Sequence, residues 1–150
     1  MSIFDLKLIK TKVKVPDKKS LFIEMVDAFY QQEIITDQAE FLATLIAREE
    51  VMSTGIGFGI GIPHGRHKTV TELKVAVYIL ENEIEFDALD GLPVKIVFMI
   101  AIPVKSNNEY MKVLNLVSKT LHEDQNRVFF SNTEDKQKIF EYLEGLEYET

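Results

Sequence analysis

The sequence contains no cysteine and no tryptophan in its 150 residues. The lack of cysteine excludes disulfides, thiolate metal ligands and cysteine nucleophiles, and it fits a reducing compartment. No apolar run approaches the roughly 20 residues that cross a bilayer, and the first residues lack the apolar core of a signal peptide. We therefore expect a cytoplasmic protein without direct membrane insertion.

Basic side chains are fewer than acidic ones. Lysine and arginine number 17 against 24 aspartates and glutamates, so the formal net charge is −7. A nucleic-acid surface needs clustered basic side chains to meet the phosphates, and this balance argues against nucleic acid as the main partner. Hydrophobic residues make up 46% of the chain, which is enough for one core. We expect a single domain over residues 1–150.

The apolar pattern predicts helices on either side of a group of strands. Apolar positions three and four residues apart, with Asp17 and Asp37 as N-caps, predict the helices. They are expected after residue 17 and over residues 37–49, 108–122, 124–130 and 133–143. Strands are expected over residues 12–15, 73–80 and 94–102, with a short edge strand over 84–86. This order predicts an α/β fold, a three-layer sandwich in which a central mixed β-sheet has helices on both faces.

Five of the seven glycines lie within residues 55–65, and this run contains His64, one of only three histidines. Glycine alternating with isoleucine or phenylalanine predicts an extended segment with large side chains on one face. Its other face would be bare backbone, open to a partner. Pro63 and Gly65 predict a turn that presents the imidazole of His64.

Two familiar site types fit this run poorly. A dinucleotide fingerprint needs a third glycine five positions after the first, and Ile60 or Ile62 stands there instead. His64 and His67 are three residues apart, but no carboxylate lies in the immediate turn, so neither a metal nor another cofactor is expected. His67 is interpreted as a solvated loop residue and His122 as a favourable charge near a helix C-terminus.

The neighbours of His64 suggest anion chemistry. Arg48 could supply a guanidinium fork, Thr54 a hydroxyl, and Gly65 and Arg66 backbone N–H donors. Together these groups suit an oxyanion or a phosphoryl group on the imidazole. The alternatives are a structural histidine bonded within a turn and a serine triad, which is disfavoured because no nucleophile elbow is present.

The segment Arg48-Glu-Glu-Val-Met-Ser-Thr-Gly-Ile-Gly-Phe-Gly-Ile-Gly-Ile-Pro-His-Gly65 resembles the phosphorylation-site signature of the mannitol/fructose-type enzyme IIA domains (EIIA type 2) of the bacterial phosphoenolpyruvate-dependent sugar phosphotransferase system. Residues 89–94 and 111–121 extend the resemblance. It implies a phosphotransferase in which His64 accepts a phosphoryl group from the HPr phosphocarrier protein and passes it to an enzyme IIB component during sugar uptake. Arg48 and Thr54 match the family's supporting arginine and hydroxyl.

The chain departs from the family pattern at two positions. Gly61 replaces the usual alanine, and Tyr110 stands where the family has its second histidine. A tyrosine hydroxyl can donate a hydrogen bond to a phosphoryl oxygen, but it does not become a cation near neutral pH. The resemblance also admits a nitrogen-type regulatory enzyme IIA, whose phosphorylation state controls partner binding, and a member that only binds. The sugar and the oligomeric state stay open.

Overall fold

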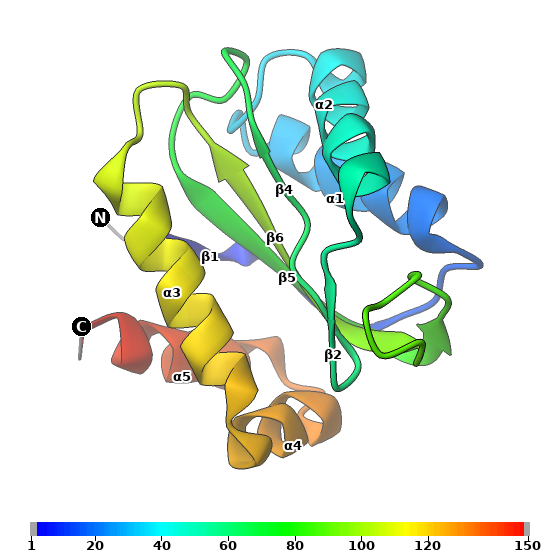
Figure 1. Ribbon diagram of the computed structural model, residues 1–150. Coiled ribbons are helices and arrows are strands. Elements are labelled where there is room, and N and C mark those ends of the chain that lie inside the picture. The colour runs from blue at the N-terminus through cyan, green and yellow to red at the C-terminus, as the bar shows by residue number, and fades with distance from the viewer. Residues whose placement is uncertain (1–2, 149–150) are drawn as a thin grey trace.

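The computed structural model describes residues 3–148 (Figure 1). Its elements, in chain order, are β1 (Phe4–Val13), α1 (Lys18–Gln31), α2 (Gln38–Val51), β2 (Gly55–Gly57), β3 (Ile60–Gly61), β4 (His64–Arg66), β5 (Lys74–Ile84), β6 (Val94–Ile102), α3 (Asn108–His122), α4 (Asp124–Asn132) and α5 (Lys136–Tyr148). Within this part of the chain no helix is long and apolar enough to cross a membrane.

The strands form one mixed sheet with the order β1-β5-β6-β3-β2, and β4 also pairs with β6. β1 runs parallel to β5, β5 antiparallel to β6, and both β3 and β4 parallel to β6. Figure 1 shows α1 and α2 on one face of the sheet and α3, α4 and α5 on the other, and a separate hydrophobic core lies under each group. The predicted three-layer α/β sandwich with a central mixed sheet is confirmed.

The predicted helix starts and the long central strand agree with the structure. Asp17 accepts a hydrogen bond from the backbone N–H of Ser20 at 2.8 Å, and Asp37 from that of Glu40 at 3.0 Å, as N-cap residues do. β6, α3 and α4 also lie where the sequence predicts them. The last helix starts later than expected, because Thr133 is extended and caps the end of α4.

Two strand predictions are wrong. β1 begins at Phe4, well before the predicted residues 12–15, and it ends at Val13. Lys12 has a φ of 53°, and the pairing with β5 shifts register between Lys10 and Val13. The consecutive residues Leu8 and Ile9 are both buried, which breaks the alternation that identifies a strand. The expected edge strand over 84–86 is absent, since Ile84 is the last residue of β5 and Phe86 is a fully buried side chain outside it.

The glycine run forms a hairpin rather than one extended segment. β2 and β3 pair antiparallel, and the chain turns at Phe58 and Gly59, whose φ values are 59° and 77°. The glycine face is covered by this chain itself. A Cβ at Gly61 would lie 2.8 Å from Cζ of Phe86, and one at Gly55 would lie 2.8 Å from Ala88. The prediction of a bare face open to a partner is therefore wrong.

Gly61→Ala tests this packing. The added methyl group has to displace the buried Phe86 ring, so we expect the free energy of unfolding to fall by about 1–3 kcal/mol in urea titrations. Gly145→Ala is the matched control, because nothing lies within 4 Å of its Cβ position in α5. It should stabilise the protein by about 0.5–1 kcal/mol through helix propensity. Equal effects of the two substitutions would contradict the packing account.

Candidate functional site

His64 is the first residue of β4, whose pairing with β6 holds it beside the buried central strand of the sheet. It is aligned with Ile100, and the N–H of Ile100 donates to the carbonyl of Pro63 at 2.9 Å. A Cβ at the next residue, Gly65, would contact Phe41 of α2 at 3.2 Å. Because successive side chains in a strand alternate, His64 projects to the opposite face, which is the face that α3 covers.

A single hydrogen bond sets the protonation pattern of the His64 ring. Nδ1 lies 2.9 Å from the carbonyl oxygen of Ile62, and His64 is half-buried. A carbonyl oxygen only accepts, so Nδ1 carries the hydrogen and the lone pair of the neutral ring is on Nε2. The imidazole thus offers Nε2 as a nucleophile while its other nitrogen is fixed to the backbone.

His67 is bound differently and is not the solvated loop residue that the sequence suggests. The backbone N–H of Thr69 donates to its Nδ1 at 3.1 Å, and its Nε2 lies 3.8 Å from the carboxylate of Glu40. The lone pair of Nδ1 is therefore occupied, and Nε2 carries the hydrogen toward the acid. His122 ends α3, as expected, and its ring centroid lies 6.5 Å from that of Phe58, with the two rings nearly perpendicular.

The structure brings Arg66 and Tyr110 together on the His64 side of the sheet. Arg66 follows His64 by two residues in β4, so both side chains lie on one face. Its guanidinium donates to the carbonyl of Val104 and to the side chain of Asn107, and it lies 5.6 Å from the centre of the Tyr110 ring. From the sequence, only the backbone N–H of Arg66 was predicted to belong to the site. Strand alternation was the signal that could have identified its side chain.

Arg48 and Thr54 make other contacts than those the sequence analysis assigned to them. Arg48 lies in the last turn of α2, and one terminal nitrogen donates to the carbonyl of Met52 at 2.8 Å. The Thr54 hydroxyl, predicted to face a phosphoryl group, donates to the carboxylate of Glu49 at 2.7 Å. Thr54 is only 4% exposed, and its connection to His64 runs through the backbone.

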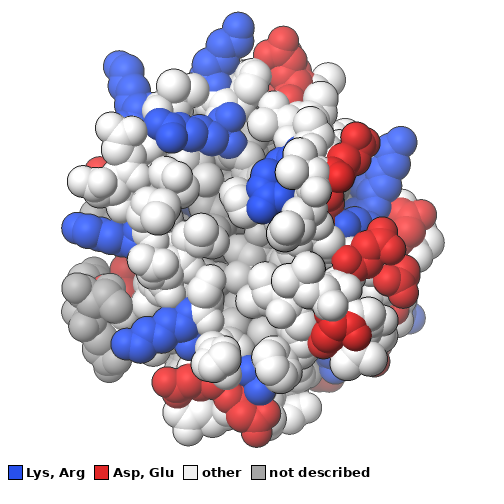
Figure 2. Space-filling model, in the orientation of Figure 1, with Lys and Arg blue, Asp and Glu red and all other residues white. Residues whose placement is uncertain are grey.

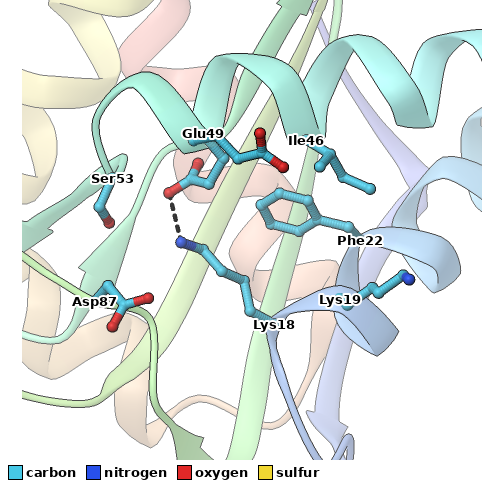
Figure 3. A pocket seen from close by; sticks show the side chains of 8 residues that line it. Lys18, Lys19, Phe22, Ile46, Glu49, Ser53 and Asp87 are labelled. Atoms are coloured by element: carbon cyan, nitrogen blue, oxygen red, sulfur yellow. Dashed lines mark ion pairs between the residues drawn. The ribbon is translucent and has the colours of Figure 1, made fainter.

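Glu49 is a buried carboxylate that the sequence analysis did not select. Figure 3 shows it facing Lys18 of α1, with 2.7 Å between Nζ and Oε2, and its side chain is only 9% exposed. Its place directly after Arg48 in the motif was a local signal. The partner 31 positions earlier could not be read from the sequence, because the packing of α1 on α2 decides it.

The two predicted backbone donors differ in availability. The carbonyl of Pro63 and the N–H of His67 both bond to β6, through Ile100 and Ile102. Alternation then directs the N–H of Gly65 toward β6 as well, where it belongs to the ladder. The N–H of Arg66 faces away from β6, so it takes no part in the hydrogen-bond ladder between the two strands.

The surface over this site is hollowed and mostly uncharged. Figure 2 shows mostly white side chains in the middle of the face that bears β4, with charged side chains of both signs around its margin. Within residues 3–148 no group of three or more histidine, cysteine, aspartate or glutamate side chains could hold a metal ion.

Three relatives share most of their length with this chain. A fructose-specific EIIA component from Haloferax volcanii is 30% identical over 142 residues, which cover 95% of this chain and 92% of the relative. The nitrogen regulatory protein IIA-Ntr from Neisseria meningitidis has a crystal structure that superposes with a TM-score of 0.86 at 29% identity, covering 91% of this chain and 93% of that one. The mannitol IIA of Escherichia coli, in complex with phosphorylated IIB, shares the fold at a TM-score of 0.81 and 18% identity, covering 95% of this chain and 99% of that one.

A family model agrees with these likenesses. Residues 2–145 match the model described as the phosphoenolpyruvate-dependent sugar phosphotransferase system, EIIA 2. The match takes in every strand of the sheet and the whole of the glycine hairpin. With that fold and that extent of match, the chain belongs to the EIIA type 2 family, the phosphotransferase components of the sugar phosphotransferase system.

Proposed function

We propose that His64 accepts a phosphoryl group from the phosphocarrier HPr on Nε2 and passes it to an enzyme IIB component during sugar uptake. The observation that carries this proposal is the hydrogen bond from Nδ1 to the carbonyl of Ile62. It keeps hydrogen off Nε2, which is the state that a nucleophilic imidazole needs. His67, with its Nδ1 occupied and its Nε2 facing Glu40, lacks this arrangement.

The transfer needs no group beyond the two proteins. The lone pair of Nε2 attacks phosphorus, the new N–P bond forms, and the bond from phosphorus to the donor breaks with its electron pair leaving on the donor atom. Nδ1 keeps its hydrogen, so the positive charge that develops on the ring lies against the Ile62 carbonyl. Transfer to IIB repeats the step with Nε2 as the leaving atom.

Arg66 and Tyr110 on the His64 side of the sheet, together with Arg48 of α2, support phosphoryl binding. The Arg66 guanidinium is held above the Tyr110 ring, and the Arg66 N–H faces away from the β6 ladder. Arg48 ends α2 beside the hairpin, with one nitrogen bonded to its own helix end. In our proposal these groups bind phosphoryl oxygens. Thr54 contributes indirectly, because its hydroxyl is bonded to Glu49.

Exposed apolar side chains around the hairpin suit the docking of partner proteins. They lie at the end of α2, on the hairpin and in the loop before β6, and they are Val51, Met52, Ile56, Phe58, Leu89 and Leu92. Asp90 fixes this loop to the hairpin by accepting from the backbone N–H groups of Leu92 and Phe58, which hold its pKa below the ordinary aspartate value. The E. coli mannitol IIA, a relative in fold, was solved with a IIB partner.

A second candidate is the nitrogen-type role, in which the phosphorylation state controls partner binding. The likeness to the Neisseria IIA-Ntr structure, at a TM-score of 0.86, favours it. The two roles separate at the second step. Transfer of the phosphoryl group to an enzyme IIB supports sugar uptake, while a stable phosphoprotein that transfers to no IIB and changes its partners on phosphorylation supports regulation.

His64→Ala should abolish phosphorylation. After incubation with phosphoenolpyruvate, enzyme I and HPr, intact-mass analysis under non-acidic conditions should show one added phosphate in the parent and none in the variant. His67→Ala is the matched control and should keep the phosphate, because the structure ties both of its ring nitrogens to other groups. A phosphate that persists in the His64 variant would overturn the assignment.

Arg48→Ala should slow transfer and leave the fold intact. Loss of one charge-assisted hydrogen bond to a phosphoryl oxygen removes about 1.5–3 kcal/mol of stabilisation. The readout is single-turnover transfer from phospho-HPr, with far-UV circular dichroism to check the helices. Lys138→Ala, which removes an exposed cation from α5, is the control. An unchanged transfer rate for the Arg48 variant would make Arg48 a helix-capping residue only.

Substitutions at Tyr110 test its departure from the family pattern. Tyr110→Phe keeps the ring beside Arg66 and should cost only about 0.5–1.5 kcal/mol, the value of one neutral hydrogen bond. Tyr110→His should make the phosphohistidine lifetime depend on pH near the reference histidine pKa of about 6.5. Lifetimes are measured by intact mass from about pH 5.5 to about pH 8. Identical profiles in all three proteins would mean that Tyr110 is a packing residue.

A further inference from the structure

The ion pair between Lys18 and Glu49 lies at one end of a hydrogen-bonded path that ends on His64. It joins α1 to α2 with 2.7 Å between the charged atoms, and both side chains are largely buried. Figure 3 shows the pair at the border of a depression of about 570 Å³ between the two helices. Buried pairs of this kind give little net stability compared with apolar packing, so another role for the pair is worth testing.

The carboxylate of Glu49 also fixes the residue where the hairpin begins. Thr54 donates to it twice, from its backbone N–H and from its hydroxyl, each at 2.7 Å. Lys18 adds a bond to the carbonyl of Phe86 at 2.9 Å, and the hydroxyl of Ser53 donates to the same carbonyl at 2.9 Å. The two bonds to one carboxylate leave Thr54 little freedom to shift or rotate.

From Thr54 the path crosses the hairpin to the imidazole. The carbonyl of Thr54 accepts from the N–H of Ile62 at 3.0 Å, and the carbonyl of Ile62 accepts from Nδ1 of His64 at 2.9 Å. Ile62, whose carbonyl sets the tautomer of His64, is therefore held through its N–H by the residue that Glu49 fixes.

We propose that Glu49, supported by Lys18, is a positioning residue for phosphoryl transfer and acts by holding the Ile62 carbonyl against Nδ1 of His64. The proposal rests on the function proposed for His64. When the Ile62 carbonyl moves away, the ring is free to place its hydrogen on Nε2, and the nucleophilic lone pair is lost there. Glu49 touches neither the phosphoryl group nor the imidazole in this role.

The decisive variant is Glu49→Gln, which keeps the shape but removes the charge. The amide has one acceptor oxygen in place of two. Its NH₂ group would therefore face a donor of Lys18 or Thr54 and could not accept a hydrogen bond from it. Glu50→Gln is the matched control, because it removes the same charge from the next residue of α2, which is exposed and lines the same depression. Lys18→Met and Thr54→Val remove other members of the path and serve if Glu49→Gln does not fold.

Two measurements separate positioning from simple loss of structure. Nitrogen NMR of the imidazole in the unphosphorylated protein reports which ring nitrogen carries hydrogen, and single-turnover transfer from phospho-HPr reports the rate. In Glu49→Gln we expect the hydrogen to redistribute toward Nε2 of His64 and transfer to slow about tenfold, as the loss of about one hydrogen bond predicts. Glu50→Gln should match the parent in both measurements.

Each remaining outcome decides against the inference. A folded Glu49→Gln protein with the parent's tautomer overturns it, whether or not transfer slows, because the ring would then not depend on the path. If Thr54→Val slows transfer without changing the tautomer, Thr54 acts on the phosphoryl group directly and the path is not its role. Failure of the proposed function is distinguishable, since the parent itself would then carry no phosphate while the tautomer measurement still tests the path.

Discussion

The pairing of β6 with two short strands on one edge is the constraint on which the site depends. Ile60 of β3 is aligned with Ile96, and His64 of β4 with Ile100, so both chains advance by four residues between these points. No slack is left in the linking residues. Pro63 has no N–H to offer a neighbour, and its carbonyl accepts from β6. The deeply buried strand at the centre of the sheet therefore dictates where the imidazole stands.

Two kinds of packing hold the hairpin that leads into this segment. On one side the contact is apolar and close, with the ring of Phe86 occupying the space that side chains at Gly55 and Gly61 would fill. On the other side it is ionic and hydrogen-bonded, through Glu49 and Thr54. Apolar contact limits how near the strands can approach, and the directed bonds limit how they can rotate.

Local patterns in the sequence predicted the parts of the fold that local physics decides. Asp17 and Asp37 predict where their helices start, because the side chain of an N-cap residue bonds to a backbone N–H within the same turn. β1 was misplaced because a bulge buries two consecutive residues, Leu8 and Ile9, and this signal depends on pairing with a distant strand. The long segment 94–102 was identified because a strand buried on both faces is apolar throughout.

The same distinction holds for the site. His64 was found from its glycine and proline neighbours, which act through the local backbone. The bond of Thr54 to Glu49 spans only five positions, and it was missed although both residues lie in the same motif. The contact of Arg66 with Tyr110 was not predicted, because it depends on how α3 packs on the sheet. The covering of the glycines by Phe86 was missed for the same reason, since 25 residues separate Gly61 from that ring.

The segment between β5 and β6 has a consequence for how this chain can change in length. Surface connections of this kind ordinarily tolerate insertions and deletions, because few contacts depend on their spacing. Here Phe86 lies under the hairpin, Leu89 donates its N–H to the carbonyl of Gly55, and Asp90 accepts from Phe58. Adding or removing one residue within this segment would move the three contacting residues away from their partners on the hairpin. This exposed connection is therefore as restricted in length as a core strand.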